Sequence, residues 1–118
     1  MGVSLVVTSL LYYNIEEETK KEYAMPTEYE KMIAGDFYKP SDPELRALAA
    51  SSREKQWAFN AEHDRLKRAE IVKSWFGSTG ENVAMNPQFV TDYGVNIHIG
   101  ENFYSNWNLT MLDICPIT

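Results

Sequence analysis

Apolar and polar residues alternate at helical spacing through the middle of the chain, and cap signals mark the helix ends. Thr27 followed by Glu30 forms a capping box, in which each side chain accepts a hydrogen bond from a free backbone N–H at the helix start. Gly35 supplies the stop, because glycine adopts the left-handed conformation that ends helices. The pattern predicts a short helix over residues 28–34.

Two longer helices are predicted next. Asp42 or Ser41 caps the second helix, with Pro43 in the first turn where its missing N–H is harmless, and the apolar pattern continues to about Asn60. A third helix is expected over about 61–76, before the run GSTG. Their apolar faces carry Leu45, Leu48, Ser52 and Phe59 in one helix, and Leu66, Ala69, Val72 and Phe76 in the other.

Beyond Gly80 the helical period gives way to a step of six residues. Two mostly apolar columns result: Tyr93, Ile99, Ser105, Met111 and Ile117, and then Ile97, Phe103, Leu109 and Cys115. A hexapeptide repeat of this kind is typical of a parallel β-helix, in which each six residues make one short strand and one tight corner. Gly94 and Gly100 are expected at corners, because tight bends need backbone angles that a Cβ atom resists.

An antiparallel hairpin with a turn at residues 100–102 is the alternative interpretation of the glycine spacing. A hairpin does not explain the later columns, so the repeat is the simpler prediction. However, residues 93–118 provide little more than one turn of such a coil, whereas repeat folds usually stack about three units to bury a continuous core.

Composition and charge exclude several classes of protein. The 118 residues, 44% hydrophobic and 24% charged, are typical of one soluble globular domain. A formal net charge of −6 has the wrong sign for a protein that follows a nucleic-acid backbone. The apolar run over residues 2–13 is too short to span a bilayer and has no preceding Lys or Arg, so neither a membrane partner nor a targeting segment is predicted.

The single cysteine and the two histidines offer little chemistry. Cys115 cannot form a disulfide within the chain, and we expect a buried structural thiol in a cytoplasmic protein. His63 and His98 are too few and too distant in the chain for a metal site, so no metal is predicted.

Three segments carry a resemblance to a known family: EKMIAGDFY (30–38), WFGSTGEN (75–82) and DYGVNIHIGENFYSNWNLTMLDICPI (92–117). Together they resemble the maltose and galactoside O-acetyltransferases over about four fifths of the chain. The resemblance implies an α+β fold, with a helical amino-terminal domain over 25–80 and the start of a left-handed parallel β-helix over 81–118. Residues 1–24 would be an extension of unknown role.

The activity implied by this resemblance is transfer of an acetyl group from acetyl-CoA to a sugar hydroxyl, within a homotrimer whose sites lie between subunits. A histidine acts as general base in such enzymes. By the resemblance it falls beyond Thr118, and neither His63 nor His98 matches its position. No catalytic residue is therefore predicted here. The chain is expected to be an amino-terminal part that is inactive alone and lacks most of the acetyl-CoA binding region.

The acceptor side of the site is better represented. By the resemblance, Asp92 and Asn106 match sugar-pocket positions, while Asp113 is next to one at which this chain has Ile114. Carboxylates and amides suit the hydroxyl groups of a neutral polyol. An alternative is that Asn106 and Asp113 are only corner residues of the coil. Pro40 stands where another pocket acid is expected, which leaves the sugar preference open.

Two aromatic residues are further candidates. Tyr104 and Trp107 can stack on a sugar face, or can cover a subunit interface. A second functional hypothesis follows, in which the chain is a non-catalytic remnant that acts as a sugar-binding or subunit-interaction module.

Overall fold

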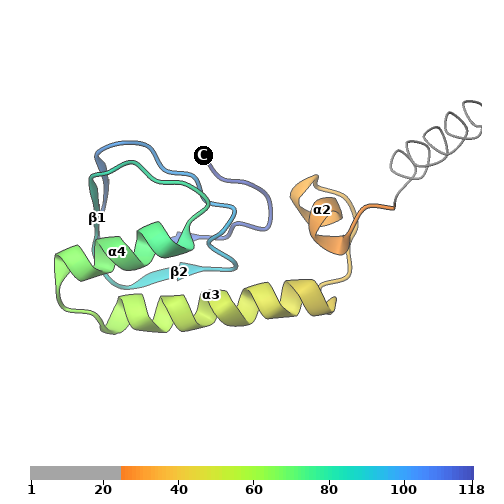
Figure 1. The fold of residues 1–118 in the computed structure, drawn as a ribbon, viewed down its shortest axis with the longest axis horizontal. Helices are drawn as coiled ribbons and strands as arrows, with labels where there is room; N and C mark the ends of the chain where they lie inside the picture. The colour runs from red at the N-terminus through yellow and green to blue at the C-terminus, as the bar shows by residue number, and fades with distance from the viewer. Residues whose placement is uncertain (1–24) are drawn as a thin grey trace, which may run out of the picture.

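The computed structural model describes residues 25–118, so the apolar run and the predicted extension over 1–24 lie outside the described residues. Three helices precede four short strands in the chain (Figure 1). α3 and α4 lie side by side, with β2 drawn between them, and α2 lies above the N-terminal end of α3. The elements are α2 (Glu28–Ile33), α3 (Pro43–Ala61), α4 (Arg65–Trp75), β1 (Val83–Met85), β2 (Phe89–Thr91), β3 (Phe103–Ser105) and β4 (Leu109–Met111).

Local signals set the first two helices where they were predicted. Thr27 and Glu30 form the complete capping box of α2, and Gly35 follows the helix with φ +81°. At the start of α3, the Asp42 carboxylate accepts hydrogen bonds from the backbone N–H groups of the first turn, and Pro43 is the first helical residue. Both boundaries follow from side chains that satisfy otherwise free donors.

The predicted start of the third helix was wrong. α4 begins at Arg65 rather than near residue 61, because Asp64 caps it by accepting from the N–H groups of Leu66 and Lys67. Its buried face consists of Arg68, Val72 and Trp75. Leu66, which was expected on the apolar face, is 69% exposed.

All strand pairs in the described chain are parallel, which excludes the hairpin alternative. Val83 pairs with Phe103 and Phe89 pairs with Leu109, so each pair joins residues 20 positions apart. The ladder begins with a bridge between Ser78 and His98, close to the predicted start of the β-helix at residue 81 and well before Tyr93, the first residue of the predicted apolar columns. The second pass of the chain therefore lies over the first along most of its length.

The six-residue step holds in the middle of the repeat and fails at its two ends. Ile97, the first member of one column, pairs with Ile117, so the step after Leu109 is eight residues and not six. Cys115 is consequently exposed, and the predicted buried thiol is wrong. Tyr93 is buried with Met32 and Leu45 instead of joining a strand column. A loop of two additional residues follows β2 and another follows β4.

The corners use asparagine as well as glycine. Gly94 has φ +76°, as predicted, and a Cβ atom there would collide with the indole of Trp75. Gly100 is not among the residues with positive φ. The left-handed positions nearby are Asn102 and Asn108, with φ 60° and 63°, six residues apart. Asparagine tolerates this conformation better than other non-glycine residues.

The main core lies between the strands and the two long helices. α4 packs on β1 and α3 packs on β2. At the centre of this core, Phe89 is fully buried, and its ring centroid lies 5.5 Å from that of Trp75 and 6.0 Å from that of Phe59. Edge-on packing of this kind stabilises aromatic clusters beyond the area that they bury.

Candidate functional site

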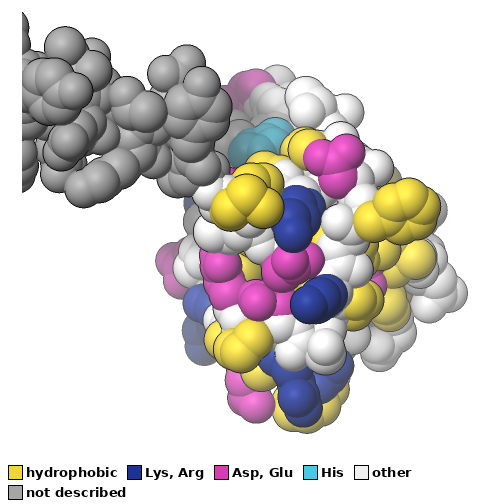
Figure 2. Space-filling model, turned by 90° about the vertical axis from the view of Figure 1, so that its right-hand side faces the viewer, with side chains coloured by type: hydrophobic (Ala, Val, Ile, Leu, Met, Phe, Trp, Pro, Cys, Tyr) yellow, Lys and Arg dark blue, Asp and Glu magenta, His cyan; other side chains and the backbone are white. Residues whose placement is uncertain are grey.

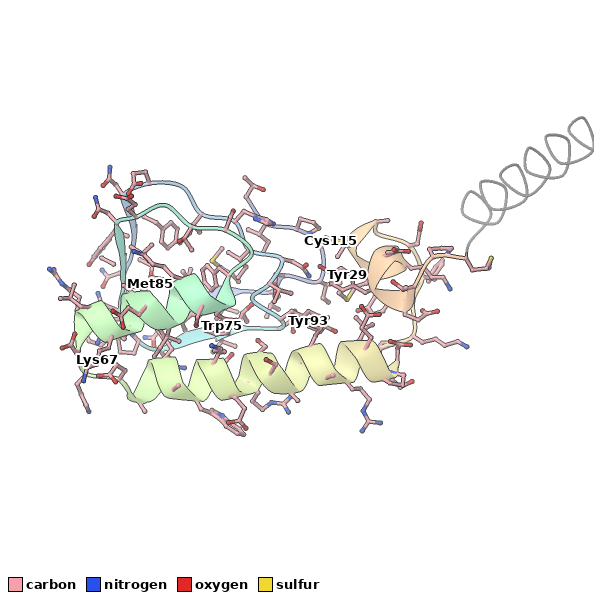
Figure 3. All side chains as sticks on the ribbon, in the orientation of Figure 1. Tyr29, Lys67, Trp75, Met85, Tyr93 and Cys115 are labelled. Carbon is pink, nitrogen blue, oxygen red and sulfur yellow. The ribbon has the colours of Figure 1, made fainter. Side chains whose placement is uncertain are left out.

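Asp92 lies where β2 ends and the loop to Ile97 begins. It lines a small cleft of about 170 Å³ against α3, whose Arg53 and Gln56 form the opposite wall. The side chain is half-buried, and its Oδ2 atom is sheltered from solvent without a hydrogen-bond partner. Figure 3 shows this region beside the labelled Tyr93, between α3 and the C-terminal strands.

The environment of Asp92 favours the protonated carboxyl. Burial raises the pKa of Asp92, and the nearby charge of Asp113 raises it further. A carboxyl group that keeps its proton can donate one hydrogen bond and accept others. This suits a hydroxyl group, which also donates and accepts.

Asp113 is fully buried, and its carboxylate binds the same loop through hydrogen bonds. Its Oδ1 atom accepts from the Thr91 hydroxyl and from the Tyr93 N–H, both at 2.8 Å, and its Oδ2 atom accepts from the Asn96 N–H at 3.1 Å. Asp113 therefore differs from Asp92 in that its carboxylate is used within the chain. A direct contact of Asp113 with a sugar stays a prediction.

Asn96 extends this network to α2. Its amide donates to the Asp113 carbonyl at 2.9 Å, and its Oδ1 atom accepts from the Tyr29 hydroxyl at 2.5 Å. Figure 3 places Tyr29, Tyr93 and Cys115 together at the end of the molecule that carries α2. Sequence reasoning missed both Asn96 and Tyr29, because 67 positions separate them and no local pattern links them.

Asn106 lies apart from the two carboxylates. It is exposed at the turn after β3, and its Oδ1 atom accepts from the Trp107 N–H at 3.0 Å. No hydrogen bond among the described residues joins it to Asp92 or Asp113. Tyr104 and Trp107 are 65% and 63% exposed, as a stacking surface or an interface would require. The structure thus brings two of the three predicted site residues together.

The histidines occupy positions unlike that of a free general base. His98 is half-buried, and its Nδ1 atom lies 2.8 Å from the Ser78 hydroxyl on the neighbouring turn of the chain. His63 is exposed before α4, and its carbonyl accepts from the guanidinium of Arg68. Within residues 25–118, no group of three potential metal-ligating side chains is found.

A larger groove lies elsewhere. It has a volume of about 530 Å³ and lies between α4 and the β1–β3 pair, with Leu66, Phe103 and Tyr104 among its lining residues. It contains none of the three predicted site residues. The smaller cleft is the better candidate, because only there does a half-buried carboxyl lack a partner.

The surface around α2 has mixed charge. Figure 2 shows Lys and Arg side chains lying next to Asp and Glu on this face, with separate apolar patches between them. This face therefore has no continuous basic patch for a phosphate backbone. Among the described residues, no helix is both long and apolar enough to cross a membrane.

Comparisons with known proteins agree with this architecture. The family model "maltose acetyltransferase hexapeptide capping motif" matches residues 31–80. A Dictyostelium discoideum protein that is provisionally named as an acetyltransferase is 49% identical over 92 residues. The match covers 78% of this chain and 48% of that protein. The galactoside O-acetyltransferase of Escherichia coli is 34% identical, over 75% of this chain and 45% of its own length.

Solved structures show the same similarity. A maltose O-acetyltransferase from Clostridium difficile is 35% identical with a TM-score of 0.74, over 77% of this chain and 50% of that one. A hexapeptide-repeat acetyltransferase from Vibrio cholerae, solved in complex with acetyl-CoA, is 28% identical with a TM-score of 0.70, over the same shares. The chain thus spans about half the length of the relatives that it matches. With its capping motif, parallel repeat and helical segment, it belongs to the maltose and galactoside acetyltransferase family of hexapeptide-repeat acyltransferases.

Proposed function

We propose that this chain carries the acceptor side of an acetyl-CoA-dependent O-acetyltransferase that acts on a sugar hydroxyl. The observation that carries the proposal is the Asp92 carboxyl, half-buried in a cleft with one oxygen unpaired and with its pKa raised by burial. Acetyl-CoA is the co-substrate of the family and would supply the acetyl group.

The chemistry of the cleft fits a neutral, hydroxylated ligand. Arg53 and Gln56 provide donors from α3, and Asp92 can both donate and accept when it holds its proton. Sugars present several hydroxyl groups that need such mixed partners, and a small polar cleft can orient one of them. We infer that Asp92 binds one acceptor hydroxyl.

The position of Asn106 suggests that the complete site is shared between subunits. It is exposed and separate from Asp92 within one chain. In a homotrimer, as the family resemblance implies, a neighbouring copy could bring its Asn106 to the Asp92 cleft. The exposed rings of Tyr104 and Trp107 would then cover the acceptor or the interface.

The fold proposed for the repeat is a left-handed parallel β-helix over residues 81–118, after a helical domain over 25–80. Support comes from the parallel pairs 20 positions apart and from the similarity to hexapeptide-repeat acetyltransferases. The proposed domain boundary lies close to the first bridge of the ladder, at Ser78.

Acetyl transfer also requires a base. The acceptor oxygen forms a bond to the acetyl carbonyl carbon, the thioester C–S bond breaks, and the hydroxyl proton passes to a general base. His98 is hydrogen-bonded to Ser78 and His63 lies outside the cleft. We therefore propose that residues 1–118 bind the acceptor sugar but do not catalyse acetyl transfer by themselves. A cytoplasmic location stays a prediction.

A non-catalytic module is the second candidate. The observation in its favour is the exposure of Trp107 and Leu112, at 63% and 58%, on the second turn of the repeat. Exposed apolar side chains on the same turn suit a contact with another subunit. In this case the chain would associate with a partner and show no dependence on Asp92.

The test measures sugar binding and acetyl transfer by the same chain. Maltose and a galactoside are titrated into the full chain, which is followed by NMR, and thiol release from acetyl-CoA is measured with each sugar. We expect binding that Asp92→Ala weakens about tenfold, because an acceptor hydroxyl loses its hydrogen-bond partner, and no thiol release. Asp36→Ala, at an exposed acid just after α2, is the matched control.

Binding that Asp92→Ala leaves unchanged would contradict the proposed acceptor site. Thiol release that depends on sugar would contradict the inactivity of this chain. Absence of sugar binding, together with concentration-dependent association that Trp107→Ala reduces, would favour the interaction module.

A further inference from the structure

The loop from Thr91 to Asn96 is fastened on both sides of Asp92. Thr91 and Tyr93, its two neighbours in the chain, both donate to the same oxygen of Asp113 at 2.8 Å. Asn96 closes the loop by donating to the other oxygen at 3.1 Å. Three donors from one short segment thus converge on one carboxylate.

Asp113 has no cationic partner among the described residues, although it is fully buried. Burial of a carboxylate is costly unless hydrogen bonds replace the lost water. Here all the replacements come from residues 91–96. The conformation of this loop and the burial of Asp113 therefore depend on each other.

Two separate helices hold the ends of the loop. The Gln56 side chain of α3 accepts from the Thr91 N–H at 3.1 Å, and Tyr29 of α2 donates to Asn96. These bonds use the polar groups on either side of Asp92. In contrast, Oδ2 of Asp92 is buried without a partner, so its orientation is set by its neighbours rather than by a bond of its own.

We propose that Asp113 is a positioning residue for acceptor recognition: by clasping Thr91, Tyr93 and Asn96, it holds Asp92 with one oxygen sheltered and the other presented to the cleft. The proposal concerns the same site as the proposed function and rests on it for the identity of the ligand. It assigns Asp113 an indirect role, in place of the direct sugar contact predicted from the resemblance.

Other charged and titratable groups face Asp92. Asp113 accepts hydrogen bonds from the loop, Arg53 lines the cleft from α3, and Tyr93, the next residue in the chain, packs with Tyr38. Burial is the main cause that raises the pKa of Asp92, and the charge of Asp113 is the second. Loosening the clasp should hydrate the sheltered oxygen, so the pKa of Asp92 should fall towards its ordinary value.

The test separates the effect of the clasp, meaning the hydrogen bonds from residues 91–96 to the Asp113 carboxylate, from the effect of the Asp113 charge. The Asp92 carboxyl is titrated by ¹³C NMR in the full chain and in two variants. Asp113→Asn removes both the charge and one acceptor, whereas Thr91→Val removes one donor and keeps the charge. Asp36→Asn serves as control, because it removes an exposed negative charge outside the clasp.

We expect the titration midpoint of Asp92 to fall in both clasp variants, most in Asp113→Asn, and to stay constant in the control. Maltose binding should weaken about tenfold in Asp113→Asn and about threefold in Thr91→Val, with the loss greatest between the two titration midpoints, where Asp92 is protonated in the parent chain and ionised in the variant.

A constant midpoint in Thr91→Val would overturn the proposal, because the charge of Asp113 would then act without positioning. A midpoint in Asp113→Asn no lower than in Asp36→Asn would also overturn it. If Asp113→Asn fails to fold, Thr91→Val alone decides. Midpoints that fall in a chain that binds neither maltose nor galactoside would support the clasp and contradict the proposed acceptor function.

Discussion

The cluster around Phe89 and the cluster around Tyr93 lie against opposite ends of α3 and are held together differently. Phe89 sits among aromatic rings, with Phe59 from the end of α3 and Trp75 from α4. Tyr93 has only Met32 and Leu45 as buried apolar partners, and the loop around it is held by hydrogen bonds to Asp113. The first cluster is apolar, and the second depends on a polar network.

Under the proposed function, this difference separates the stability of the chain from its recognition of a ligand. Apolar packing is nondirectional, so the Phe89 cluster can join helices to strands without setting any single polar group. Hydrogen bonds are directional, and a fully satisfied buried network specifies one loop conformation. Asp92, whose Oδ2 atom is buried without a hydrogen-bond partner, lies in the region held by the network.

The largest expected effect is in the apolar cluster. Phe89→Ala should lower the free energy of unfolding by about 3–5 kcal/mol, because it leaves a large cavity among rings that cannot collapse into it. Val90→Ala, next to it and 41% exposed, should cost far less. Urea unfolding measures both. Equal losses would show that the aromatic cluster is not the main core.

Gly94→Ala should have the second largest effect, about 3 kcal/mol, because the residue has φ +76° and a Cβ atom would collide with Trp75. The control is Gly100→Ala, where a Cβ atom meets nothing within 4 Å. We expect the control to change the melting temperature little. If Gly94→Ala caused little loss of stability, the two clusters would be less tightly joined than the structure indicates.

Tyr29→Phe should cost about 1 kcal/mol, because the Asn96 side-chain oxygen loses its donor while the ring stays packed. Hydrogen exchange should also quicken in residues 92–96 more than in β2. Tyr104→Phe, on an exposed ring, is the matched control. Equal hydrogen-exchange protection of residues 92–96 in both variants would contradict a role of α2 in holding the loop.

The smallest effect is expected at Glu101, outside both clusters. Hydrogen bonds from the Glu81 and Asn82 N–H groups lower its pKa below the ordinary 4.5. Because the folded pKa is lowered, its stabilisation is present above about pH 4.5 and is lost as the pH falls through the lowered value.

Glu101→Gln should therefore lower the melting temperature slightly at pH 7 and not at all in strong acid. Glu54→Gln, at an exposed position of α3, provides the baseline. A difference between the Glu101 variant and the parent chain that does not change with pH would contradict the role of these backbone bonds.

The sequence by itself determined the features that short-range rules control. The capping box of Thr27 and Glu30 and the Asp42–Pro43 start are set within four residues, so α2 and α3 were predicted close to their observed bounds. The repeat was recognised from its period, and the specific motifs identified the family.

The tertiary structure decided which residues complete the repeat and the site. Ile117, and not the exposed Cys115, pairs with Ile97 of the first turn. This follows because residues pair 20 positions apart, so the loop after β4 must contain two residues more than the six-residue step. Asp113 is buried and bound by hydrogen bonds only because the coil brings the loop of residues 91–96 next to it. The hydrogen bond from Tyr29 to Asn96 likewise joins residues 67 positions apart. A local pattern cannot encode these contacts, since each depends on elements that meet only after the helices have packed on the coil.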